Sequence, residues 1–227
     1  MKRSLCLFVS VLIILIIDGC GFMGKDLADM DPKDLPNETA FQDDFTREFM
    51  ASIEPVEDGY YEFESKTGGY TMKYPENALM NKGFYERKMN TFERLRYAEN
   101  KDEDDIPYYV IATYDHSHSS QDIDSLLYLL SSSVKYDGDF EEFEHQDNTI
   151  FFATKEKTTK SKKTTWYKFF GLVKSNNSNQ SLEYIYNVQC ENQPGNCSYD
   201  LETIEQKVKD IMKSVEFKDM ELEGEEG

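Results

Sequence analysis

The residues with the clearest potential for chemistry are Ile17-Asp18-Gly19-Cys20, which end the only long apolar run of the chain. Lys2 and Arg3 precede that run. Its length of about 13 residues suits a secretory signal rather than a bilayer-spanning helix, which needs about 20 residues. A signal peptidase requires small, extended residues before its cut, and a thiol directly after the cut can accept a diacylglyceryl group. The pattern therefore predicts a signal peptide over residues 1–19 and lipidation of Cys20.

This segment resembles the bacterial lipobox, in which an aliphatic residue, two small residues and a cysteine follow one another. Asp18 departs from the pattern, because that position is usually Ala, Ser or Thr. The alternative is an ordinary signal peptide that is cut nearby and leaves Cys20 unmodified. Lipidation, with diacylglycerol and palmitate as the expected lipid groups, would anchor a lipoprotein on the extracytoplasmic face of the cell membrane.

The two remaining cysteines of the mature chain are Cys190 and Cys197, which flank a Pro194-Gly195 turn. Their proximity allows a disulfide that closes a small loop and contributes about 2.5 kcal/mol if it is unstrained. A metal site is the alternative, but no histidine neighbours the pair. A disulfide also persists outside the cell, so the pattern favours a disulfide.

A basic turn contrasts with the acidity of the chain, whose formal net charge is −19. Five lysines fall close together: Lys155, Lys157, Lys160, Lys162 and Lys163. Such a patch can attract phosphate-rich polymer or lipid head groups even where the net charge repels them. The alternative is a solubilising hairpin tip that blocks pairing at a strand edge. The overall acidity argues against nucleic acid as a partner.

Two other polar clusters have weaker signatures. Asp115-His116-Ser117-His118 combines possible zinc ligands with a serine, but metal sites need three or four convergent ligands, and His145 is the only other histidine. We interpret this cluster as a polar turn. The acidic run 99–105 offers oxygen ligands for calcium, yet lacks the glycine and the final glutamate of an EF-hand loop, so a solvated turn is favoured. We expect no metal, no cofactor and no catalytic residue.

Hydrophobic periodicity predicts an α+β fold with a central antiparallel sheet flanked by helices. Helical spacing marks residues 38–52, 123–134 and 201–215, with Ser119 or Ser120 as the cap of the second helix and Asp200 as the cap of the third. Strands are predicted at residues 60–63, 70–74, 92–97, 108–114, 139–145, 149–155, 165–173 and 181–190.

The domain organisation follows from these patterns. The signal occupies residues 1–19, and lipidated Cys20 begins a flexible tether that extends to residue 37. Fully extended, about 17 residues of tether would reach roughly 55–60 Å. The α+β domain spans residues 38–218, and residues 219–227 form an acidic tail.

Three segments carry a family resemblance: Asp31-Pro-Lys-Asp-Leu-Pro36, Gly59-Tyr-Tyr-Glu-Phe63 and Thr67-Gly-Gly-Tyr-Thr-Met-Lys-Tyr-Pro75. Together with the lipobox and tether, they resemble the YvcA-type membrane lipoproteins of Bacillus relatives. More broadly, the third segment and a closing helix over residues 201–217 are similar to PsbP-like domains. These resemblances imply an antiparallel sheet flanked by helices and a binding or assembly role in surface community architecture, without an assigned reaction.

We therefore expect a non-enzymatic, lipid-anchored module that binds an envelope protein or polymer and supports envelope or biofilm organisation. One alternative is a lipoprotein that captures a small ligand or cation through the acidic run and tyrosine-rich strand faces. A less favoured alternative is an envelope hydrolase, which requires two convergent carboxylates in a cleft, one with a raised pKa.

Overall fold

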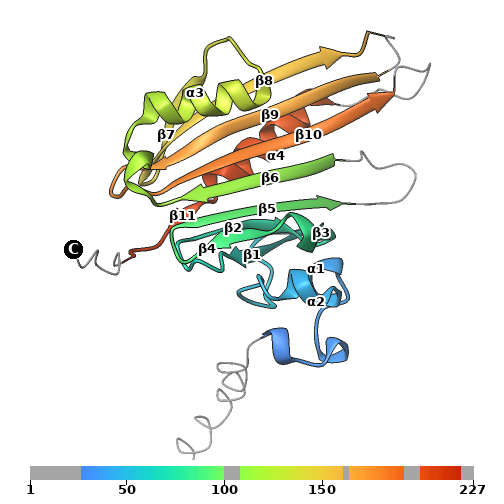
Figure 1. The fold of residues 1–227 in the computed structure, drawn as a ribbon. Helices are drawn as coiled ribbons and strands as arrows, with labels where there is room; N and C mark the ends of the chain where they lie inside the picture. The colour runs from blue at the N-terminus through green and yellow to red at the C-terminus, as the bar shows by residue number, and fades with distance from the viewer. Residues whose placement is uncertain (1–26, 100–107, 161–163, 192–199, 221–227) are drawn as a thin grey trace, which may run out of the picture.

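The computed structural model describes residues 27–99, 108–160, 164–191 and 200–220. Its main feature is an antiparallel sheet in the order β3-β5-β6-β10-β9-β8-β7, with β4 also paired to β5 (Figure 1). The strands are β3 (Ala78–Met80), β4 (Glu86–Lys88), β5 (Phe92–Glu99), β6 (Tyr108–Asp115), β7 (Glu141–His145), β8 (Asn148–Thr158), β9 (Thr164–Ser175) and β10 (Ser181–Glu191). The predicted α+β class with a central antiparallel sheet is confirmed.

A smaller antiparallel sheet joins β1 (Tyr60–Glu64), β2 (Tyr70–Pro75) and β11 (Glu216–Phe217) in the order β1-β2-β11. The predicted hairpin between β1 and β2 forms, and Gly68 adopts a φ of +73° in its turn, a conformation that favours glycine. Tyr74 of β2 packs on Tyr97 of β5 with ring centroids 4.8 Å apart. The small sheet therefore closes the main core against the large one.

Two helices cover opposite faces of the large sheet, α3 (Ile123–Val134) in front and α4 (Leu201–Lys213) behind in Figure 1. Because side chains alternate along a strand, neighbours on β9 face different helices. Phe170 joins the cluster under α3, whereas Phe169 joins the main core that α4 covers. Both helices thus bury one apolar face, as their spacing predicts.

The caps of these helices were only partly foreseen. Asp200 caps α4 as predicted, and its carboxylate accepts from the backbone of Thr203 at 3.2 Å. The cap of α3 is Asp122, which accepts from the backbone and hydroxyl of Ser125, rather than Ser119 or Ser120. A carboxylate one turn closer to the first apolar residue is better placed for the free amides of the helix.

The helix predicted over residues 38–52 was wrong in its length. The segment forms two single turns, α1 (Thr39–Gln42) and α2 (Asp44–Arg47), separated by Asp43 in an extended conformation. The Asp43 carboxylate accepts from the amide and hydroxyl of Thr46, each at 2.7 Å, and so starts the second turn. The phenyl stripe still packs on the domain, and Phe41 and Phe49 are fully buried.

Residues 27–37, assigned to the tether from sequence, contact the domain. They contain two 3-10 turns, η1 (Leu27–Asp29) and η2 (Pro32–Asp34), and Leu35 is buried in the main core. The Gln42 side chain donates to the carbonyl oxygens of Pro32 at 3.0 Å and Pro36 at 2.8 Å. The packed part of the chain therefore begins before residue 38.

Candidate functional site

The predicted basic turn lies at the end of the long β8–β9 hairpin. The strands pair as far as Thr158 opposite Thr165, and Lys157 and Lys160 are exposed near the tip. Lys162 and Lys163 lie outside the described residues. Lys155 has a structural role, because its ammonium donates to the carbonyl oxygens of Val134 and Lys135 at the C-terminal end of α3.

Strand register adds residues to this turn that the sequence had not indicated. Lys168 of β9 lies directly opposite Lys155, and Trp166 lies directly opposite Lys157, all on the face of the sheet that carries α3. Burial, and then the positive charges of Lys155 and Lys157, lower the pKa of Lys168. Like charges on neighbouring strands are unfavourable for folding, so this arrangement favours a counter-charge from outside the chain.

An aromatic and cationic pair continues this face on the neighbouring strands. The Arg96 guanidinium of β5 lies 4.2 Å from the ring centroid of Tyr109 on β6 and 4.8 Å from that of Phe84. Register places Tyr109 opposite Asn187 of β10, and Asn187 in turn opposite Lys168. We call Arg96, Tyr109, Trp166, Lys157 and Lys168 the basic face.

The basic face adjoins, but does not include, the part of the sheet under α3. That helix packs on Phe170 and Leu172, further along β9 than Lys168. Arg94 is excluded from the definition because it lies opposite Glu86 and near Glu183. A surface of this kind attracts anions and offers flat rings for stacking.

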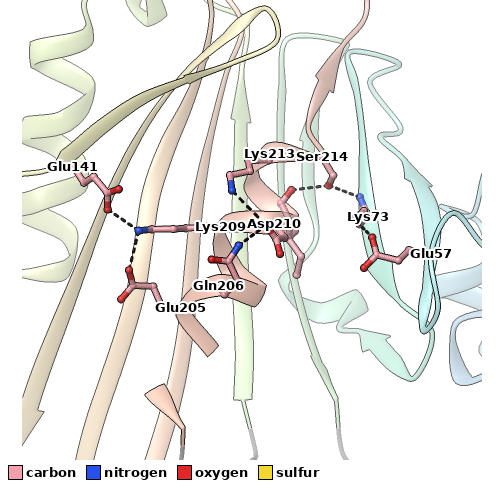
Figure 2. A network of polar contacts seen from close by, with 10 residues as sticks. Glu57, Lys73, Glu141, Glu205, Gln206, Lys209, Asp210, Lys213 and Ser214 are labelled. Carbon is pink, nitrogen blue, oxygen red and sulfur yellow. Dashed lines mark hydrogen bonds and ion pairs between the residues drawn. The ribbon is translucent and has the colours of Figure 1, made fainter. Parts of the chain in front are cut away.

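A concave region lies along α4, where residues of the helix, β1 and β2 line a groove of about 490 Å³. Figure 2 shows the polar groups along it. The Lys73 ammonium pairs with Glu57, and the Lys73 backbone N–H donates to Ser214 Oγ at 2.9 Å. Ser214 Oγ in turn donates to the Ile211 carbonyl oxygen at 2.6 Å, which attaches the end of α4 to β2.

The other polar contacts of α4 in Figure 2 also hold the helix in place. Lys209 lies 2.6 Å from a Glu141 carboxylate oxygen on β7 and 2.8 Å from Glu205. Burial opposes the charge on Lys209, but these two hydrogen bonds outweigh it and raise the pKa of the ammonium. The ion pairs that do line the groove are Lys73 with Glu57 and Lys213 with Asp210.

The cluster at 115–118 forms a polar turn in its described part. Asp115 accepts from the Ser117 amide at 2.6 Å, and His116 is 5% exposed with burial lowering the pKa of its imidazole. Of the acidic run 99–105, only Glu99 is described, and it lies 3.7 Å from Lys207 of α4. No group of three or more His, Cys, Asp or Glu side chains within the described ranges is placed to hold a metal ion.

Most rings of the tyrosine-rich strands are turned away from solvent, and Tyr109 on the basic face is an exception. The fully enclosed tyrosines point into the main core and pack on one another: Tyr70, Tyr74, Tyr97, Tyr114 and Tyr184. These residues therefore do not form the tyrosine-lined cleft that capture of a small ligand would require. Their alternation in sequence had suggested half-buried strands but did not show which face was enclosed.

One carboxylate that sequence reasoning missed is Glu93, which is fully enclosed. Burial raises the pKa of Glu93, although hydroxyl groups of Ser65, Tyr85 and Tyr70 donate to it at 2.8, 2.9 and 3.2 Å. The Lys66 amide donates as well, at 3.0 Å. The donors to this carboxylate come from its own chain and connect β5 to the β1–β2 hairpin and to Tyr85.

Of the cysteines predicted to be lipidated or to form a disulfide, only one belongs to the described residues. Cys190 lies near the end of β10 and is 2% exposed, whereas Cys20 and Cys197 lie outside the described residues. Among the residues with defined positions, no helix combines the length and apolarity needed to cross a membrane. Both the lipidation and the disulfide stay predictions.

Comparison with known proteins connects the chain to a described family. A family model named "Putative lipoprotein YvcA" matches residues 36–216. A protein of the same description from Bacillus subtilis (strain 168) is 30% identical over 194 residues, which cover 83% of this chain and 80% of that protein.

Solved structures show a more distant likeness. A mutant of the protein Mog1 aligns with a TM-score of 0.42 and 11% identity, over 69% of this chain and 95% of that one. A protein from Bacteroides thetaiotaomicron VPI-5482 aligns with a TM-score of 0.39 and 9% identity over 70% of this chain. This chain spans 48% of the length of that protein.

Proposed function

The chain belongs to the YvcA lipoprotein family, and from that premise we propose that lipid on Cys20 anchors it to the extracytoplasmic face of the cell membrane. The apolar run before Gly19-Cys20 supports this proposal, since it is too short to span the bilayer comfortably. Two or three acyl chains would give stable attachment, whereas the acidic chain has no bulk attraction for anionic lipid.

The anchored domain acts as a non-enzymatic binding module in envelope or biofilm organisation. The observation that carries this proposal is the basic face, on which Lys157 and Lys168 lie beside Trp166 in a chain of net charge −19. Lys168 is partly buried beside the like charges of Lys155 and Lys157, which does not help folding, so a partner of opposite charge accounts for this arrangement better. The partner is an envelope polymer or protein with exposed anionic groups.

A disulfide between Cys190 and Cys197 belongs to the same proposal. An extracytoplasmic location supports it, because disulfides persist in oxidising surroundings. Cys190 is the last residue but one of β10, the strand between Tyr109 and Lys168, so a closed loop there would hold one end of β10 beside the basic face.

The test is complementation of a deletion strain with three forms of the chain: wild type, Cys20→Ala, and Lys157→Gln/Lys168→Gln. We expect wild type to restore colony and biofilm architecture and both variants to fail. Labelling with a clickable palmitate analogue should mark wild type and the lysine variant, but not Cys20→Ala. A deletion without any change in architecture would end the organisational role, and full rescue by Cys20→Ala would separate function from anchoring.

Capture of a small ligand is a second candidate because the groove along α4 has a volume of about 490 Å³, within the usual range of ligand sites. Its lining includes Met72 and Val56 beside the pair of Lys73 and Glu57. A thermal-shift screen of small metabolites and calcium tests this candidate. A stabilising compound whose effect disappears in Met72→Glu, but persists in Lys168→Gln, would favour the groove over the basic face.

A further inference from the structure

We propose that the basic face binds an acidic polysaccharide, a sugar polymer that carries carboxylates at intervals along its chain. This inference rests on the binding-module function proposed above and specifies its ligand class. The basic face crosses five adjacent strands, from Arg96 on β5 to Lys157 on β8. Four strand spacings amount to about 19 Å, a length that suits several linked sugar units rather than one small anion.

Cations and aromatic rings occur together on this surface. The Arg96 guanidinium lies over the ring of Tyr109, and Trp166 lies between the strand positions of Lys157 and Gln189. Lysine and arginine side chains bind carboxylates through charge-assisted hydrogen bonds. The faces of Tyr and Trp combine an apolar body with a polar edge, which suits the mixed C–H and hydroxyl surface of a sugar ring.

A buried acceptor beneath the basic face distinguishes a sugar polymer from a simple polyanion. Asn187 is 1% exposed, and register places it between Tyr109 and Lys168. Its amide nitrogen is directed toward the carbonyl oxygens of Tyr109 and Ile185, while its Oδ1 is buried with no partner among the described residues. Oδ1 needs a donor, which a hydroxyl of a sugar supplies and a phosphodiester or carboxylate does not.

The charge of the whole chain also bears on the choice of ligand. A net charge of −19 repels a dense polyanion. Only those parts of the polymer that lie within about one Debye length of the lysines are attracted. Nucleic acid and an acidic polysaccharide both carry charges along the chain, but the sugar rings of the polysaccharide also carry several uncharged hydroxyls. The polysaccharide therefore adds hydrogen bonds from neutral hydroxyls to the local attraction of the lysines.

Binding of the full chain, purified in detergent, to four immobilised polymers tests the inference. Polygalacturonate carries carboxylates and hydroxyls, polyglutamate carries carboxylates on an amide backbone without hydroxyls, dextran carries hydroxyls without carboxylates, and oligo(dT) is a single-stranded nucleic acid. We expect the tightest binding to polygalacturonate, with an affinity that falls as salt is raised. Lys168→Gln and Trp166→Ala should each weaken this binding by about tenfold.

Lys33→Gln is the matched control, because Lys33 is an exposed lysine on η2, outside the basic face. It should leave the affinity unchanged, and the melting temperature of every variant shows whether it has folded. Equal binding of polyglutamate and polygalacturonate, preference for oligo(dT) or dextran, or an equal loss in Lys33→Gln would each overturn the inference. Absence of binding to all four polymers would overturn it too, while complementation by the Cys20 and lysine variants would still decide the proposed function.

Discussion

The hydroxyl oxygens of Tyr97 and Tyr184 lie 2.6 Å apart in the fully buried core, where one phenol donates a hydrogen bond to the other. The pair joins β5 to β10 across the intervening strand β6. Such a contact contributes little net free energy when intact, because both hydroxyls were hydrogen-bonded to water in the unfolded chain. Removal of one of the two hydroxyls leaves the other as a buried polar group without its partner.

Replacing only one member of this pair should therefore be worse than replacing both. We expect Tyr97→Phe to lower the free energy of unfolding by about 1–3 kcal/mol, because it leaves the Tyr184 hydroxyl without this partner. Tyr97→Phe/Tyr184→Phe should recover part of that loss. Urea unfolding of the four members of the double-mutant cycle measures the coupling, and strictly additive losses would contradict it.

Gly171 of β9 should not accept a side chain. A Cβ at this position would lie 2.1 Å from the Phe151 carbonyl oxygen and 2.5 Å from the Met212 side chain of α4. Gly171→Ala should destabilise the domain by about 2–3 kcal/mol, because backbone rather than a flexible side chain blocks the space. Gly83→Ala is the control, since its nearest neighbour is Asn81 Oδ1 at 3.4 Å. Equal melting temperatures for the two variants would count against this packing.

The imidazole of His116 should make stability depend on pH. Burial lowers the pKa of His116 below 6.5, with Asp115 opposing that shift and Lys174 adding to it. The folded state thus binds fewer protons here than the unfolded chain, so stability is complete above about pH 6.5 and decreases as the pH falls below it. His116→Gln should remove this component from unfolding curves measured across that range.

His145→Gln is the control for this titration, because it removes another histidine and leaves His116 in place. It should keep the pH dependence of the wild type. If His116→Gln and wild type lose stability equally between neutral and mildly acidic pH, the buried imidazole is not responsible.

The proposed disulfide should be visible in both mass and stability. Cys190→Ser/Cys197→Ser should lose about 2.5 kcal/mol relative to wild type under oxidising conditions, the chain-entropy value for a loop of this size. In dithiothreitol the two proteins should unfold alike. Alkylation before and after reduction, read by mass spectrometry, checks the pairing directly, and two freely alkylated thiols in native wild type would refute it.

The sequence patterns located the long elements because their periodicity is local. The alternation from Tyr108 to Tyr114 and the helical spacing from Leu201 to Val215 each depend on neighbouring residues alone. The break at Asp43 was missed because a side chain that caps a helix competes with the apolar stripe that continues past it. The short strands β3, β4 and β11 were missed because their pairing partners are distant in the chain or lack a repeated pattern.

The candidate site was harder to predict than the fold. Lysine density pointed to the β8–β9 turn, but Lys155 proves to support α3, and Lys168 and Trp166 join Lys157 only through strand register. Arg96 approaches this surface from a strand far earlier in the sequence, beside Tyr109. No spacing rule within one segment could bring these residues together, because the order of strands in the sheet decides it.

The packing of Leu35 and of the turns around it limits how far the domain can stand from the bilayer. With the lipid on Cys20, as proposed, only the seven-residue stretch up to Leu27 separates the anchor from the packed chain. Fully extended, that stretch spans about 25 Å, less than half the reach expected of a tether that continued to residue 37. The domain would therefore stay close to the membrane, and a partner must approach the lipid surface in order to bind it.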